Sequence, residues 1–204
     1  MSADTREDQS LSVRFENALI FSTRLHAKQK RKQSDIPYVA HLLGVTAIVL
    51  EDGGDEDEAI AALLHDAVED QGGLKTLSEI RKRFGERVAD IVYAVSDSYA
   101  TPKPSWRERK EKYIQSISTA SESTIRVSLA DKVYNASTTL RDIRKEGDKG
   151  WDRFNGGKEG TLWYYGQLII AFKQVGSNYL LQELERIIKE LRNIAGNWNE
   201  ISSN

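Results

Sequence analysis

The chain has 204 residues, of which 39% are hydrophobic and 29% charged, and its formal net charge at pH 7 is −2. Its three histidines come with no cysteine, which excludes a disulfide scaffold, a thiolate metal site and catalysis by a thiol nucleophile. The near-neutral charge provides no overall field for nucleic acid, and no long apolar run indicates a membrane span or a leader, so we expect a cytoplasmic protein.

Apolar residues recur at helical spacing along most of the chain, and only three prolines interrupt the pattern. We predict a first helix over residues 12–31. A second helix, over 37–53, has Pro37 in its first turn, where the missing N–H of proline costs nothing, and it ends at a Gly-Gly pair. A third helix spans 56–71 and ends at another Gly-Gly pair.

Helix-start signals and periodicity position the remaining elements. A serine or threonine followed three residues later by glutamate is typical of a capping box, and two such pairs occur: Thr76 with Glu79, and Ser105 with Glu108. Two prolines break helical structure in the middle of the chain. The predicted helices span 76–84, 86–97, 106–117, 122–145, 161–175 and 178–193, with loops or short turns over 98–105 and 146–157.

These elements predict an all-α fold of roughly ten helices. No linker rich in proline, glycine or serine divides the chain and no internal repeat occurs, so we expect one domain over residues 1–204. Residues 1–11 are polar and are expected to be flexible. The chain is long enough to bury a sizeable core, so polar residues inside apolar helices carry information about function.

One apolar helix contains an unusual set of polar residues. Residues 61–68 are mostly apolar, yet His65, Asp66, Glu69 and Asp70 occur in or next to this stretch. Burying carboxylates is costly unless they are paired or bind a cation. His65 with Glu69, and Asp66 with Asp70, are four residues apart, so each pair shares a helix face. Alternatively, these acids form the solvated edge of an amphipathic helix.

Two other segments show the same contrast. Asp131 and Asn135 lie four residues apart in an otherwise apolar stretch, and His41 lies among apolar neighbours. A lone histidine in such a helix is more often a satisfied core residue than a ligand. The three anomalies together predict one shared site.

The ordered set of these motifs resembles the HD phosphohydrolase superfamily. It looks like the hydrolase domain of the RelA/SpoT family, and most like the stand-alone small alarmone hydrolases. The resemblance covers residues 12–175 and implies an HD-domain helical bundle. The motifs that carry it are PYVAH (37–41), ALLHDAVED (62–70), FGERVADIV (84–92) and LADKVYN (129–135).

The resemblance implies one divalent ion. Its ligands would be His41, His65, Asp66 and Asp131. Imidazoles and carboxylates without thiolate suit Mn²⁺, which this family usually carries, or another divalent first-row ion. Such an ion lowers the pKa of bound water and supplies hydroxide near neutral pH. The acids one turn further on would orient this water and move its proton as catalytic residues: Glu69 and Asp70.

The implied reaction is hydrolysis of the 3′-pyrophosphate of (p)ppGpp, or of its adenine analogue, to GDP or GTP and pyrophosphate. The substrate of this stringent-response hydrolase would therefore be a small nucleotide rather than a nucleic acid or a membrane. Its contacts, by resemblance, would be Arg31, Lys32, Lys110, Asn135 and Tyr164, with Arg153 and Lys158 as weaker phosphate candidates. Each basic residue also fits a solvated surface. We interpret His26 as an ordinary helix residue.

Two alternatives stay open: another HD phosphohydrolase such as a nucleotidase, and a degenerate HD domain that acts as a binding module. Ile36 stands where a Gly-Glu or Gly-Thr pair commonly precedes Pro-Tyr, so the choice between guanine and adenine is also open. Tyr134 stands where long family members carry His, which favours the stand-alone group. We expect no synthetase domain after the two closing helices. An oligomer is compatible with the sequence, but nothing specifies one.

Overall fold

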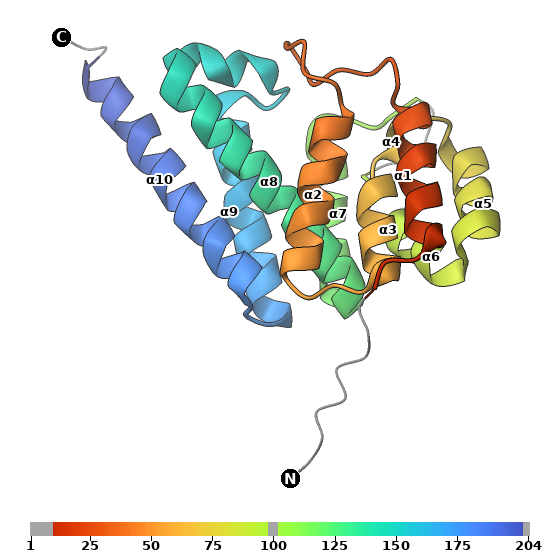
Figure 1. Cartoon of the computed structure of the whole chain (residues 1–204). Helices are drawn as coiled ribbons and strands as arrows, with labels where there is room; N and C mark the ends of the chain where they lie inside the picture. Colours follow the sequence, from red (N-terminus) through yellow and green to blue (C-terminus); the bar gives the residue numbers. More distant parts are fainter. Residues whose placement is uncertain (1–9, 98–101, 202–204) are drawn as a thin grey trace.

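The computed structural model describes residues 10–97 and 102–201 (Figure 1). Within these ranges the fold is all-α, as predicted, with a single isolated bridge between Lys30 and Pro37. The predicted flexible segment over 1–11 falls outside the described residues except for its last two. The described α-helices are α1 (Val13–Leu25), α2 (Val39–Glu51), α3 (Glu56–Leu64), α4 (Ala67–Asp70), α5 (Gly73–Phe84), α6 (Glu86–Val95), α7 (Trp106–Ser116), α8 (Glu122–Glu146), α9 (Gly157–Val175) and α10 (Tyr179–Ile201).

Helix α8 lies in the middle of the bundle (Figure 1) and contacts α2, α3, α6 and α10. Every residue from Val127 to Asp131 is buried, as expected of a helix that is covered by neighbours on several sides, and further buried residues follow every three or four positions. The buried apolar residues of α8 include Val127, Ala130, Val133, Ala136, Leu140 and Ile143. Two short 3₁₀ segments, Ile117–Thr119 and Gly147–Arg153, flank α8 at its ends.

Helices α2 and α8 approach each other closely at Gly44. A Cβ atom on Gly44 would lie 1.9 Å from Cε2 of Tyr134, so only glycine leaves room for this ring. The Tyr134 hydroxyl donates to the Ala40 carbonyl at 3.2 Å, and its ring centroid lies 5.1 Å from that of His41. The Tyr134 ring therefore packs against His41 between α2 and α8.

The third predicted helix is not continuous. It breaks after Leu64, and α4 begins at Ala67, so His65 and Asp66 lie in the break. The His65 ring Nδ1 lies 2.7 Å from the Ala62 carbonyl, the acceptor that the amide of Asp66 would use in a regular helix. The break turns both side chains toward α2.

Other predicted boundaries also shift. The first predicted helix ends at Leu25, so residues 26–38 form a loop, and Pro37 lies two residues before α2. The predicted capping box at Thr76 is wrong, because α5 already begins at Gly73 and the Thr76 hydroxyl donates to the Gln71 carbonyl. Ser105 does cap its helix, accepting from the Glu108 amide at 3.3 Å.

Arg126 joins α8 to the turn between α2 and α3. Its Nη1 donates to both carboxylate oxygens of Glu58 at 2.7 Å, and its Nε donates to Asp52 at 3.2 Å. The Glu58 side chain is only 3% exposed, whereas that of Arg126 is 30% exposed. The Glu58 carboxylate therefore depends on Arg126 for its compensating charge.

We expect Arg126→Met to lower the free energy of unfolding by about 3 kcal/mol, because it leaves the Glu58 carboxylate buried without its cation. Urea unfolding followed by circular dichroism measures this change. The matched control is Arg141→Met on the same helix, where the arginine side chain is 63% exposed and the expected change is below about 0.5 kcal/mol. Equal effects of the two substitutions would contradict the prediction.

Candidate metal centre

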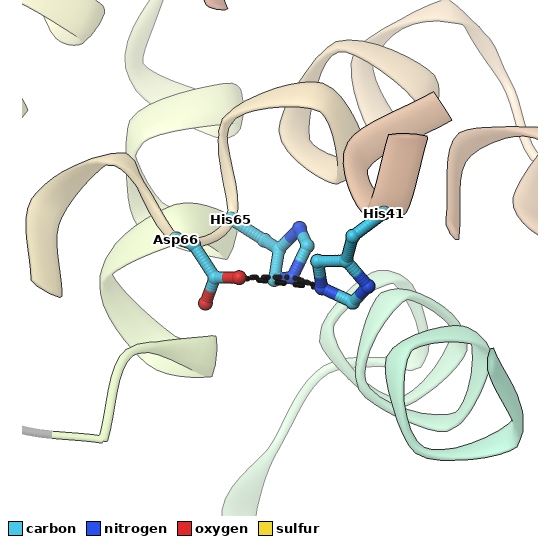
Figure 2. Close-up of side chains that lie close together, drawn as sticks. All are labelled: His41, His65 and Asp66. Atoms are coloured by element: carbon cyan, nitrogen blue, oxygen red, sulfur yellow. Dashed lines mark hydrogen bonds and ion pairs between the residues drawn. The ribbon is translucent and has the colours of Figure 1, made fainter. Parts of the chain in front are cut away.

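Four polar side chains from three separate segments converge near the beginning of α2. His41 comes from the first turn of α2, His65 and Asp66 from the break between α3 and α4, and Asp131 from α8. Figure 2 shows His41, His65 and Asp66 pointing at one another, with their ligand atoms mutually within 4.8 Å. The two imidazole Nε2 atoms are 3.0 Å apart, and both face Asp66 Oδ2, at 3.3 Å from His41 and 3.0 Å from His65.

Asp131 completes the set from the α8 side. Its Oδ1 lies 3.4 Å from His41 Nε2 and 3.6 Å from His65 Nε2. Adjacent ligand atoms around one ion with bonds of about 2.1 Å lie about 3.0 Å apart in an octahedron and about 3.4 Å apart in a tetrahedron. The mutual spacing of His41, His65 and Asp66 therefore fits one divalent ion, and Asp131 faces both histidines of this set.

The protonation of the histidines also fits a metal ion. The Ala62 carbonyl can only accept, so His65 carries its proton on Nδ1 and turns the lone pair of Nε2 toward the cluster. Both histidine side chains are almost fully buried, at 1% and 4% exposure for His41 and His65. The Nε2 lone pair of His65, next to the carboxylates of Asp66 and Asp131, can be satisfied by a cation in the cluster.

The electrostatics of the cluster favour positive charge at its centre. Burial opposes a charged His65, yet the carboxylates of Asp66 and Asp131 outweigh it and raise the pKa of His65 well above its ordinary value. Burial likewise works to raise the pKa of both aspartates. The histidines, with Lys132 beside Asp131, outweigh it and hold both pKa values well below the usual range.

Two residues next to the cluster were missed by the sequence interpretation. The Tyr38 hydroxyl donates to Asp66 Oδ2 at 2.6 Å, and Lys132 Nζ donates to Asp131 Oδ2 at 2.6 Å. Asn135, which was predicted, donates to Asp131 Oδ1 at 2.6 Å. Tyr38 and Lys132 both lie inside the motifs quoted above. Their closeness in sequence to His41 and Asp131 is the signal that could have identified them.

Glu69 and Asp70 lie on α4, beyond the cluster. Glu69 Oε1 accepts from Lys103 Nζ at 3.0 Å, and its Oε2 accepts from the Asp97 amide at 3.4 Å. Asp70 is exposed, and its Oδ2 accepts from Gln29 Nε2 at 2.7 Å. Burial of its carboxyl end and the nearby Asp66 carboxylate raise the pKa of Asp70.

Two adjoining cavities surround the cluster. The inner one has a volume of about 290 Å³ and the outer one about 840 Å³. Together they are lined by every predicted metal-binding and catalytic residue and by the five main predicted substrate contacts. The inner cavity includes Lys32, His41, His65, Asp66, Glu69, Lys110, Asp131, Asn135 and Tyr164. The outer cavity adds Arg31 and Asp70.

Four of the five predicted substrate contacts pair with one another: Arg31 with Asn135, and Lys110 with Tyr164. Arg31 donates to Asn135 Oδ1 at 2.8 Å, and Lys110 lies 4.8 Å above the Tyr164 ring while donating to Asp97. Lys32 donates to Asn155 at 3.3 Å, which connects the loop 26–38 to the turn before α9. Within the described part of the chain the Tyr164 hydroxyl is buried without a hydrogen-bond partner.

Of the two weaker phosphate candidates, Arg153 and Lys158, only Arg153 lines a cavity of the site. Arg153 lines the outer cavity and forms ion pairs with Asp142 and Glu146 at 2.5 Å each. Lys158 donates to the Ala195 carbonyl at 2.8 Å and lines neither cavity. The inner cavity instead contains Arg109, a cation that the sequence interpretation overlooked, paired with Asp97.

None of the described helices is long and apolar enough to cross a membrane. The HD domain family matches residues 18–161 of the chain.

Two curated relatives cover much of the chain. The guanosine-3′,5′-bis(diphosphate) 3′-pyrophosphohydrolase MESH1 of Xenopus tropicalis is 40% identical over 134 residues, which are 64% of this chain and 70% of that protein. The MESH1 protein of Mus musculus is 37% identical over 174 residues, covering 84% and 88%. A solved structure described as a metazoan orthologue of SpoT that hydrolyses ppGpp superposes with a TM-score of 0.73 at 27% identity, covering 89% of this chain and 97% of that one.

Proposed function

Because this chain belongs to the HD-domain family, among the RelA/SpoT-type hydrolases, we propose that it is a metal-dependent 3′-pyrophosphohydrolase of guanosine-3′,5′-bis(diphosphate). The observation that carries the proposal is the convergence of His41, His65, Asp66 and Asp131 beside cavities lined by cationic side chains. A full donor set argues against a degenerate binding module. We propose that residues 1–204 work as one HD-type unit.

The donor chemistry supports a divalent ion, and we propose Mn²⁺. Two imidazoles and two carboxylates suit Mn²⁺ among the divalent first-row ions. When bound, such an ion supplies a Lewis acid that makes water a competent nucleophile near neutral pH. Lys132 binds Asp131 Oδ2 and leaves Oδ1 facing both histidines, which keeps this carboxylate in its ligating orientation.

The remaining chemistry belongs to side chains of the chain itself. Water attacks the phosphorus attached to the 3′ oxygen, the bond from that phosphorus to the 3′ oxygen breaks, and pyrophosphate leaves. Asp70, with Glu69 beside it on α4, accepts one proton from the attacking water, and the same proton passes to the 3′ oxygen, which leaves as a hydroxyl. Lys110, beside the metal-binding side chains in the inner cavity, stabilises the charge on the phosphoryl oxygens.

The nucleoside lies in the outer cavity. Arg31 lines this cavity with Lys32 and Asn135, and its guanidinium lies 5.8 Å from the Tyr38 ring centroid. A planar guanidinium held against one aromatic ring can stack on a purine on its other face. Tyr164 contacts the part of the nucleotide next to the reacting phosphate from the inner cavity.

A substrate panel tests the proposed function. With Mn²⁺, purified protein should release pyrophosphate from ppGpp, and chelation of the metal should abolish this release until Mn²⁺ is restored. The panel includes the adenine 3′-pyrophosphate analogue and nucleoside 5′-monophosphates. Phosphate release from the monophosphates without pyrophosphate release from ppGpp would replace the proposal with a nucleotidase.

Tyr38→Phe should weaken Mn²⁺ binding. The substitution removes the hydroxyl that orients Asp66, and loss of such an outer hydrogen bond typically costs about 10-fold in metal affinity. Isothermal titration calorimetry of metal-free protein gives the dissociation constant. The matched control is Tyr134→Phe, whose ring also contacts His41 but whose hydroxyl binds a backbone carbonyl. Equal affinities of the two variants would refute this role of Tyr38.

A further inference from the structure

The third histidine is not the ordinary helix residue that the sequence suggested. His26 follows α1 as its C-terminal cap and is 3% exposed. Its ring stacks on Tyr38, with centroids 5.2 Å apart and planes 15° apart. Its Nδ1 lies 2.7 Å from Oε1 of Gln29. His26 is therefore part of a buried polar network beside the site.

The Gln29 side-chain amide is held from both ends. Its Oε1 accepts from Gln71 Nε2 at 2.5 Å as well as facing His26 Nδ1. Its Nε2 donates to Asp70 Oδ2 at 2.7 Å. The opposite orientation of the amide would place an oxygen against the Asp70 carboxylate and a nitrogen against the Gln71 amide nitrogen, so only one orientation satisfies all three neighbours.

This orientation determines the tautomer of His26. Because the Gln29 oxygen has no proton to give, His26 carries its proton on Nδ1 and keeps Nε2 bare. The Nε2 atom is buried and has no hydrogen-bond partner in the described part of the chain, as a bare nitrogen permits. Burial lowers the pKa of His26, which favours this neutral ring.

We propose that Gln29 is a positioning residue for Asp70, and that His26 and Gln71 clamp its amide in the orientation that donates to this carboxylate. The inference rests on the proposed function, in which Asp70 accepts a proton. Asp70 ends the four-residue helix α4, and its Oδ2 accepts from Gln29, which lies outside that helix. Gln29, which lies in the loop after α1, donates to the Asp70 carboxylate and holds it at the outer cavity. We call His26, Gln29 and Gln71 the clamp.

The kinetic test compares two glutamines of similar partial burial. Gln29→Met keeps the size of the side chain but removes its donor, and should lower kcat about 10-fold while KM stays within about 2-fold. The control is Gln167→Met on α9, a residue that lines neither cavity, with unchanged kcat expected. An unchanged kcat in Gln29→Met overturns the proposal.

A double-mutant cycle separates positioning from a general loss of structure. If Gln29 acts only through Asp70, then Gln29→Met added to Asp70→Asn should lower kcat no further. If Gln29→Met lowers kcat by the same factor in the wild type and in Asp70→Asn, Gln29 acts elsewhere and the proposal is overturned.

Imidazole ¹⁵N spectra test the clamp without any turnover. The chain has three histidines, so each ring can be assigned in metal-free protein. The clamp requires the Nδ1–H tautomer for His26, and Gln29→Met should shift its Nδ1 resonance while Gln167→Met does not. A wild-type Nε2–H tautomer overturns the clamp. This result is independent of the substrate, so failure of the clamp and failure of the proposed function are distinguishable.

Discussion

Asp66→Asn is expected to lower kcat for pyrophosphate release by about three orders of magnitude and to abolish measurable Mn²⁺ binding. Asp66 Oδ2 faces both imidazoles, at 3.3 Å from His41 and 3.0 Å from His65, so one carboxylate oxygen contacts both histidines of the cluster. An amide in its place carries no charge to bind the ion, and if its nitrogen faces inward it offers no lone pair.

The measurement pairs initial rates on ppGpp with calorimetric titration of Mn²⁺ into metal-free protein. Asp90→Asn is the control, because the Asp90 side chain on α6 is 65% exposed and lines neither cavity. Its rate and affinity should equal those of the wild type. Retention of both Mn²⁺ binding and turnover by Asp66→Asn would remove Asp66 from the metal centre.

Asp70→Asn should separate proton transfer from metal binding. We expect kcat to fall about 100-fold, within the range for loss of a general base, while the Mn²⁺ dissociation constant is unchanged. Asp70 binds Gln29 and belongs to the outer cavity rather than to the set of converging ligand atoms. Steady-state rates and calorimetry on the same preparation measure the two quantities.

The pH profile adds a second readout for Asp70. Burial and the Asp66 carboxylate raise the pKa of Asp70 above its ordinary value, and a base acts only when deprotonated. Wild-type kcat should therefore decrease when the pH is lowered. The midpoint of this decrease should lie above the ordinary pKa of an aspartate. This acid limb should be absent in Asp70→Asn. An identical acid limb in the variant would assign proton transfer to another group.

The proposed metal ligands could be singled out from the sequence because each is a local anomaly. A histidine or carboxylate inside an apolar helix is visible in one turn of sequence, and the family motifs connect the three segments. The break at His65 and Asp66 could not be predicted, because its apolar neighbours continue the helical pattern on both sides. At this break the His65 ring Nδ1 lies 2.7 Å from the Ala62 carbonyl, a contact that the residue pattern does not reveal.

The residues that the sequence interpretation missed share one property. Nothing in the sequence pattern marks Tyr38 or Lys132, because the role of each depends on a hydrogen-bond partner in the fold. Tyr38 donates to Asp66, and Lys132 donates to Asp131 Oδ2, the oxygen that does not face the histidines. His26 was misread for the same reason, since its partner Gln29 is near in sequence but the carboxylate that Gln29 holds is 41 residues away.

The sequence by itself determined the all-α class, most helix positions and the residue types of the candidate site, because periodicity and helix-breaking residues act over a few positions. Only the tertiary structure decided which polar groups meet. Arg31 and Asn135 are 104 residues apart yet share a hydrogen bond, and His41 meets Asp131 because Gly44 admits the Tyr134 ring between α2 and α8. Hydrogen bonds and ion pairs depend on distances of a few ångströms, and packing between helices distant in the chain sets those distances.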